Sequence, residues 1–144
     1  MAGTKTDTRD TPDTQLFRAL RQGRVEEANG ILDANLSLKS RDADGNTALM
    51  LAAHHSLINI VKRLVRDGAE VNAANICGDT PLKWAVAGVS SADNTETMRF
   101  LIRHGARVLD KNEHGITVLE FAGYIGRTEL LDIFEEDMVA SGRE

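Results

Sequence analysis

Three short stretches of this chain have nearly the same amino-acid sequence. Residues 44–56 read DGNTALMLAAHHS, residues 77–89 read CGDTPLKWAVAGV and residues 114–126 read HGITVLEFAGYIG. A period of 20 to 50 residues is typical of solenoids, in which stacked supersecondary units share one core. The recurring residues are Gly45, Gly78 and Gly115; Thr47, Thr80 and Thr117; Leu49, Leu82 and Leu119; and Ala52, Ala85 and Ala122.

Each repeated residue has a local role in a turn that leads into a helix. The Gly permits a positive φ in a tight turn, and the Thr hydroxyl can accept a hydrogen bond at a helix start. Leu and Ala then lie three residues apart on one helical face. A second helical pattern follows at 57–68 and 95–105, and each ends at a Gly suited to a left-handed cap. The sequence therefore predicts a unit of turn, helix, helix and extended hairpin.

This unit resembles the ankyrin repeat. The similarity is carried by DADGNTALMLAA (42–53) with GAEVNA (68–73), and by GDTPL (78–82) with GARV (105–108). A weaker copy begins near Thr14, and a last copy begins at Asn112. The resemblance implies an all-α repeat fold, an ankyrin-like solenoid of about four helix-turn-helix repeats with β-hairpin loops.

The resemblance covers about 13–138, between a flexible N-terminal tail at 1–12 and a C-terminal tail at 139–144. Four extra residues fall within 88–96 of the third copy, and we expect them to form a surface loop between its two helices. The repeats themselves occupy about 13–41, 42–74, 75–111 and 112–138.

Two positions depart from the family pattern. Ala48 and Val118 replace its Pro, which loosens the helix start slightly. The family's next conserved His is also replaced, so the hydrogen bonds that it makes between repeats are not assigned to these residues. The replacements are Met50, Lys83 and Glu120.

Composition limits the compartment and the class of partner. A net charge of −5 argues against nucleic acid, which would require a basic face. The single cysteine, Cys77, excludes an internal disulfide and suits a reducing compartment. The first 14 residues are polar and no apolar run approaches the length of a membrane span. We therefore expect a cytoplasmic monomer that binds neither nucleic acid nor a membrane.

The sequence offers no constellation of reactive groups. His54 and His55 are adjacent, and neighbouring helical residues point about 100° apart, which hinders shared metal ligation. No histidine spacing matches a zinc pattern, and the glycines fall at turns and caps rather than in a phosphate-binding loop. The sequence thus predicts no catalytic residue, no metal site and no cofactor, and the chain is not expected to be an enzyme.

What remains is recognition of another protein. Stacking aligns the hairpin tips and first helices of a solenoid into one concave surface, and in ankyrin-like proteins that groove is the usual partner-binding face. The resemblance therefore implies an adaptor or scaffold. The residues carried over as partner-binding are Arg21, Asp44, Asn46, His54, His55, Ile76, Cys77, Asp79, His114, Ile116, Tyr124 and Ile125.

Several alternatives stay open at this point. Ile76 or Ile116 could instead cover a neighbouring hairpin, and Trp84 could pack in the core or anchor a partner. The protein could be a dedicated inhibitor or immunity protein that neutralises one partner through the same groove. It could also be a small enzyme or metal-dependent protein, or it could contact a larger assembly through its acidic C-terminal cap, which contains Glu135 and Glu136.

Overall fold

The computed structural model describes residues 11–34, 38–88 and 91–141, which form eight helices. The predicted tail residues 1–10 and 142–144 lie outside this part of the chain. The helices are α1 (Pro12–Arg21), α2 (Val25–Leu32), α3 (Ala48–His54), α4 (Ile58–Arg66), α5 (Pro81–Val86), α6 (Ser91–Arg103), α7 (Val118–Tyr124) and α8 (Glu129–Ser141).

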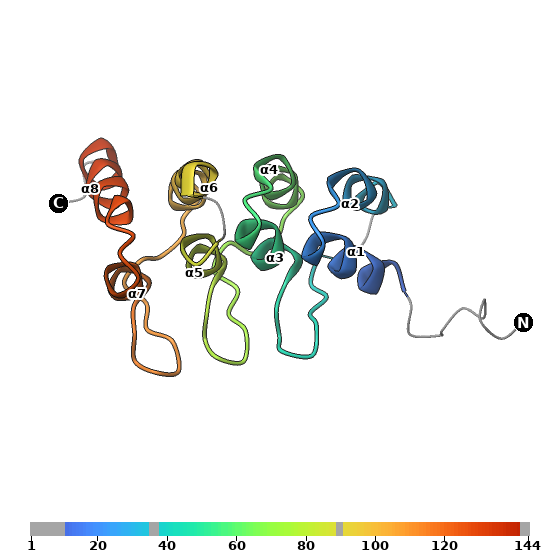
Figure 1. The fold of residues 1–144 in the computed structure, drawn as a ribbon, viewed down its shortest axis with the longest axis horizontal. Helices are drawn as coiled ribbons and strands as arrows, with labels where there is room; N and C mark the ends of the chain where they lie inside the picture. The colour runs from blue at the N-terminus through green and yellow to red at the C-terminus, as the bar shows by residue number, and fades with distance from the viewer. Residues whose placement is uncertain (1–10, 35–37, 89–90, 142–144) are drawn as a thin grey trace, which may run out of the picture.

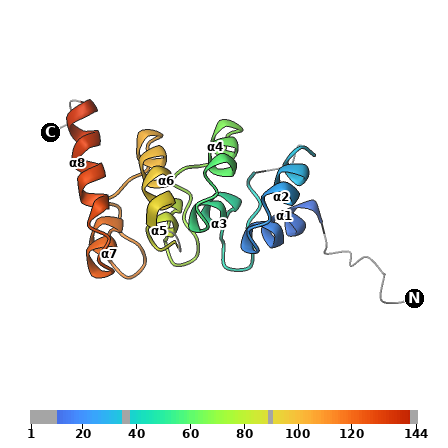
Figure 2. The same cartoon turned by 45° about the horizontal axis from the view of Figure 1, so that its top comes forward.

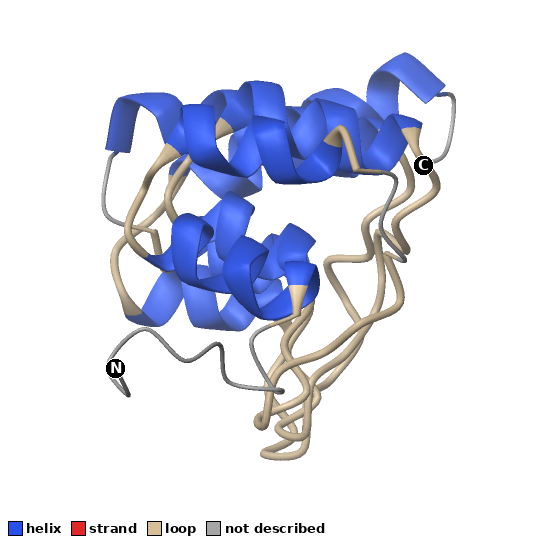
Figure 3. Ribbon diagram, turned by 90° about the vertical axis from the view of Figure 1, so that its right-hand side faces the viewer, coloured by secondary structure: helices blue, strands red, loops and turns tan. Residues whose placement is uncertain are grey.

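The helices form two rows with the loops along one edge. Helices α1, α3, α5 and α7 make an inner row, and α2, α4, α6 and α8 make an outer row above it (Figure 1). The two rows keep this order along the whole stack (Figure 2). Seen along the stack, the loops leave the inner helices and project away from the outer row (Figure 3). This arrangement confirms the predicted ankyrin-like solenoid.

The predicted hairpins are turns rather than strands. Among the described residues the only β-type pairing is one isolated antiparallel bridge, between Lys111 and Thr117. The extended segments are therefore held by contacts other than a continuous strand ladder.

None of the helices formed by the described residues is both long and apolar enough to cross a membrane.

The recurring Thr residues begin the inner helices as the sequence predicts. The Thr47 Oγ1 accepts a hydrogen bond from the Met50 amide at 3.3 Å, and the Thr117 Oγ1 accepts one from the Glu120 amide at 3.0 Å. Glu120 completes a capping box, because its Oε2 accepts from the Thr117 amide at 2.9 Å. Thr80 makes no such cap, and Pro81 starts α5 instead.

The core lies between the two rows and is mainly aliphatic. Ala52 and Ala85 have no exposed surface, and Leu49 and Leu82 are equally well buried. The small Ala side chains let adjacent inner helices pack closely, which explains why Ala recurs at that point of each repeat.

The insertion within 88–96 differs from its prediction as a surface loop. Helix α6 begins at Ser91 and has 13 residues, whereas α4 has nine. Residues 91–96 read SADNTE, and Ser, Asp and Glu favour the first turn of a helix. Most of the insertion thus lengthens α6, while residues 89–90 lie outside the described residues. Helix α8 likewise continues to Ser141, past the predicted end of the last repeat at 138.

The close approach of consecutive tips predicts different costs for two matched substitutions. Gly78 and Gly115 occupy the same turn position with φ of +77° and +74°, but only a Cβ at Gly78 meets the next tip, 2.9 Å from the Glu113 nitrogen. Gly115→Ala should lower the free energy of unfolding by about 1 kcal/mol, because Ala is strained at a positive φ. Gly78→Ala should cost about 1–3 kcal/mol more, because the tips must separate. Urea denaturation measures both; equal losses would contradict the tip packing.

Candidate partner-binding surface

One side chain organises the turn at each of three tips. The Asp42 Oδ1 accepts hydrogen bonds from the amides of Asp44 and Asn46, both at 2.9 Å. The Oδ1 of Asn75 does the same two and four residues on, at 2.9 and 3.0 Å, and that of Asn112 does so at 2.9 and 3.1 Å. Within each tip, the Asp or Asn side-chain oxygen therefore adds two hydrogen bonds to the backbone bonds that close the turn, such as the one from the Asn75 amide to the Asp79 carbonyl at 3.0 Å.

The same residues join each tip to the one before it. The Asn75 side-chain Nδ2 donates a hydrogen bond to the Asn46 Oδ1 at 2.8 Å, and the Asn112 side-chain Nδ2 donates one to the Asp79 Oδ1 at 2.9 Å. Backbone bonds run alongside, from the Ile76 amide to the Asp44 carbonyl at 3.1 Å and from the Glu113 amide to the Cys77 carbonyl at 2.9 Å. We call this set of contacts the tip ladder.

The residue types at the two ends of the tip ladder fit their positions. No earlier tip lies within the described residues, and the Asp42 carboxylate pairs with Arg21 and accepts from the Asn46 side chain at 3.1 Å. Burial acts to raise the pKa of Asp42, but the hydrogen bonds from Asn46 and Asp44, together with Arg21, hold it below its ordinary value. Ile116 stands where Asn46 and Asp79 stand in the earlier tips, but its side chain has no acceptor atom for a further Asn.

The tip ladder separates the predicted tip residues into two groups. Asn46 is 6% exposed, and Asp79 is half-buried and bonded to both Asn112 and Lys83. These two residues therefore position the tips rather than offer a free contact surface, and Ile116 is also half-buried. The remaining tip residues are exposed to solvent, and Ile76 has 66% of its surface accessible. They are Asp44, Ile76, Cys77 and His114.

The ends of the inner helices supply the other predicted residues. Tyr124 is 73% exposed and Ile125 is 45% exposed at the end of α7. His54 and His55 are half-buried at the end of α3, and the exposed Arg21 ends α1. The inner helices lie side by side along the stack (Figure 1), and these residues stand at or just after the C-terminal ends of α1, α3 and α7.

Aromatic rings meet in the middle of this row. His54 lies edge-on to Trp84 of the next repeat, with ring centroids 5.4 Å apart, and edge-on to His55 at 5.1 Å. Trp84 is half-buried and packs against the core, so part of its side chain is structural and part remains accessible. Burial, and then the neighbouring His54, lowers the pKa of His55 below 6.5. The neutral ring therefore prevails at pH 7, and its contribution to stability is lost as the pH falls below 6.5.

We call the accessible members of these two groups the recognition face. Its members are Arg21, Asp44, His54, His55, Ile76, Cys77, His114, Tyr124 and Ile125.

Sequence reasoning missed the residues that align the tips. Asp42, Asn75 and Asn112 each stand three residues before a turn Gly, and this Asp or Asn spacing was the available signal. Arg41 was also missed; its guanidinium donates to the carbonyls of Gly45 and Ala74 at 2.9 and 2.6 Å, bracing one tip against the next.

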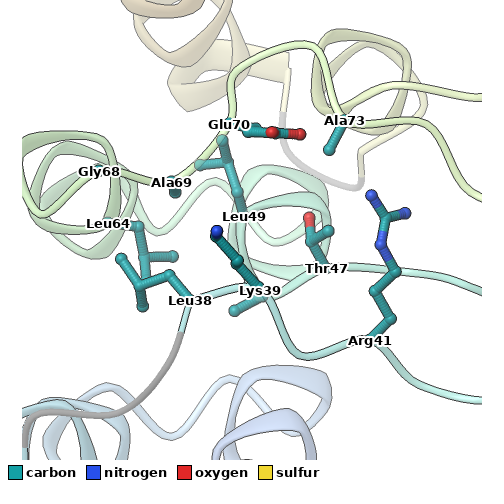
Figure 4. A pocket seen from close by; sticks show the side chains of 11 residues that line it. Leu38, Lys39, Arg41, Thr47, Leu49, Leu64, Gly68, Ala69, Glu70 and Ala73 are labelled. Atoms are coloured by element: carbon teal, nitrogen blue, oxygen red, sulfur yellow. The ribbon is translucent and has the colours of Figure 1, made fainter.

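Two further features of the described residues concern metal binding and cavities. The described residues contain no group of three or more His, Cys, Asp or Glu placed to hold a metal ion. A hollow of about 300 Å³ lies between the segments 38–41 and 68–73, and Leu49 and Leu64 are among the residues that line it (Figure 4). Lys39, Arg41 and Glu70 line it, and no residue of the recognition face does.

Comparison with known proteins identifies the repeat. Residues 44–76 and 77–113 match the family model "Ankyrin repeat". The chain is 31% identical over 74% of its length to "BRCA1-associated RING domain protein 1" of Caenorhabditis elegans. It is 32% identical over 85% of its length to "Probable E3 ubiquitin-protein ligase XBOS31" of Oryza sativa subsp. japonica, and 31% identical over 67% of its length to human "Ankyrin repeat domain-containing protein 63".

The chain spans only a part of each relative. It covers 15%, 27% and 25% of their lengths in the order given. The similarity therefore concerns the repeats and not the other regions of those proteins. Ankyrin repeats are generally protein–protein interaction modules, and the family is typically non-enzymatic.

The tip ladder makes a testable prediction at Asn112. Asn112→Asp keeps the turn acceptor but replaces the amide donor with a carboxylate facing that of Asp79, 2.9 Å from the lost nitrogen. The variant should lose about 1–3 kcal/mol of unfolding free energy at pH 7. Asp79 raises the pKa of the introduced carboxyl, so the charge penalty exists above that pKa and disappears as the pH falls through it.

Asn112→Ala is the reference, because it also lacks the donor and adds no charge; it lacks the turn acceptor as well, at every pH. Urea denaturation at pH 7 and pH 5 should show the gap in unfolding free energy between the two variants shifting in favour of Asn112→Asp as the pH falls. A gap that does not change with pH would mean that the two side chains do not face each other.

Proposed function

Because this chain belongs to the ankyrin-repeat family, we propose that it is a non-enzymatic adaptor that binds a protein partner on its recognition face. The partner would lie in the concave groove between the hairpin tips and the ends of the inner helices. We further propose that the protein acts as a monomer in the cytoplasm.

The observation that carries this proposal is the exposure of large apolar side chains on that face. Tyr124 and Ile125 lie at the end of α7, and Ile76 lies at a tip, all three open to solvent. None of these three side chains belongs to the buried core, so packing within the chain does not account for them. An apolar patch with a polar rim is typical of a protein-binding site, and Tyr is enriched among the residues that dominate binding energy.

The charge and rigidity of the face also support a protein partner. Arg21 is neutralised by Asp42, and His55 is uncharged at pH 7, so few free charges oppose the burial of this surface. The tip ladder fixes the backbone on which Ile76 and His114 stand, which lowers the entropy cost of binding. A typical contact would bury about 800 Å² on this side.

A dedicated inhibitor or immunity protein is the second candidate function, and it would use the same face. The two functions differ in the number of partners and in the consequence of binding. An adaptor should bind several proteins and leave their activities intact. An inhibitor should bind one protein tightly and abolish that protein's activity.

The test is affinity capture from the native cell extract, followed by titration of each purified partner. Tyr124→Ala/Ile125→Ser should weaken binding by about 2 kcal/mol, or about 30-fold in Kd, because two apolar contacts are lost. Leu109→Ser is the matched control, since Leu109 is 61% exposed but lies outside the recognition face. It should bind as wild type does, and thermal melts should show that both variants are folded. Equal affinities for wild type and Tyr124→Ala/Ile125→Ser would move the binding site away from this face.

A further inference from the structure

The outer helices share one register, and it shows which face each of them turns to its neighbour. Positive φ at Gly23, Ser56 and Gly126 marks the same point before α2, α4 and α8. Gly68 and Gly105 mark the same point after α4 and α6. In this register Ala28, Val61, Met98 and Leu131 occupy one position.

Burial at that position changes only in the last helix. Ala28, Val61 and Met98 are each 0% exposed, whereas Leu131 is 45% exposed. Helix α2 packs against α4, α4 against α6 and α6 against α8. In the described chain α8 is the last of this row, so the face that buries Val61 and Met98 has no helix against it in α8 (Figure 1).

The next position along each helix makes a polar contact with the following helix. The Asn29 carbonyl and side-chain oxygens accept from Arg63 at 3.3 and 3.4 Å. Lys62 pairs with Glu96 at 3.6 Å, and Arg99 pairs with Glu136. In α8 this position is Asp132, whose charge is opposite to that of Lys62 and Arg99. Because the equivalent residues pair with the following helix, we expect a group that pairs with Asp132 to be a cation.

The other exposed residues of α8 also favour a cationic partner. Glu135 follows Leu131 by one helical turn, and Val139, 73% exposed, follows by two. Helix α8 carries five carboxylates and no Lys or Arg. Asp132 and Glu135 form no ion pair with any residue that the structure describes, and they repel each other at the i, i+3 spacing. Two copies of the chain would also repel each other here, which disfavours a symmetric dimer through this face.

We propose that the α8 face, formed by Leu131, Asp132, Glu135 and Val139, is a second docking surface that takes a cationic amphipathic helix from a partner protein. The partner helix would pack on α8 as α8 packs on α6, with apolar side chains against Leu131 and Val139. Its Lys or Arg side chains would pair with Asp132 and Glu135. This inference does not rest on the recognition face, which lies at the tips and at the ends of the inner helices.

The test uses a synthetic helical peptide of about 18 residues, with Leu along one stripe and Lys beside it. The full chain is titrated with this peptide and with a copy in which Glu replaces every Lys. Amide resonances that shift should lie within 128–139. Affinity for the Lys peptide should fall as salt rises, because the pairing charges are partly exposed. The Glu peptide should not bind.

Two double variants separate local pairing from overall charge. Asp132→Lys/Glu135→Lys should weaken binding of the Lys peptide at least about tenfold. Glu26→Lys/Glu70→Lys changes the net charge equally at exposed carboxylates elsewhere and should keep wild-type affinity. Leu131→Ser/Val139→Ser should also weaken binding, while Tyr124→Ala/Ile125→Ser should not. The last variant therefore distinguishes failure of this proposal from failure at the recognition face.

Three results would overturn the proposal. One is no saturable binding of the Lys peptide up to about 1 mM. Another is equal loss in the two charge variants, which would indicate bulk attraction only. The third is self-association of the wild-type chain that Leu131→Ser/Val139→Ser abolishes, which would assign the face to a second copy.

Discussion

The rest of the structure depends on the paired use of one side-chain amide at Asn75 and Asn112. Its oxygen closes the turn within a tip, and its nitrogen bonds the tip before it. These bonds supplement the backbone hydrogen bonds within and between the tips, where the described residues form no continuous strand ladder. Because each tip is tied both to itself and to its neighbour, the inner helices that follow begin at a fixed register.

Placement of the inner helices determines what reaches solvent. Thr47 and Thr117 begin α3 and α7 directly after their tips, so the ends of these helices fall in line. Small Ala residues inside the stack keep the helices close, and the larger Tyr124 and Ile125 remain outside. The outer row follows the same repeat, with one face of each helix buried by the next until α8. Both proposed surfaces are therefore products of the repeat: one runs along it and the other ends it.

The sequence predicted the repeat because its signals are local. Gly at a positive φ, Thr at a helix start and Leu with Ala on one face each act within a few residues. Most of the missed features depend on contacts between repeats. Asn46 looked like an exposed tip residue, and only the position of Asn75 shows that it is buried. The residues 91–96 resembled a polar loop, although Ser91 begins a longer α6. Leu131 gives no sign in the sequence that its buried equivalents are Val61 and Met98.

We conclude from the tip ladder that the tips are held rigid before any partner binds. Hydrogen exchange of backbone amides in the free protein measures this rigidity. The amides of Cys77 and His114 belong to exposed residues but donate to Asn75 and Asn112. They should exchange far more slowly than unstructured amides, and so should those of Ile76 and Glu113, which bond the preceding tip. Exchange of all four at the rate of an unfolded chain would contradict the claim, because the tips would then be loose and the recognition face would form only on binding.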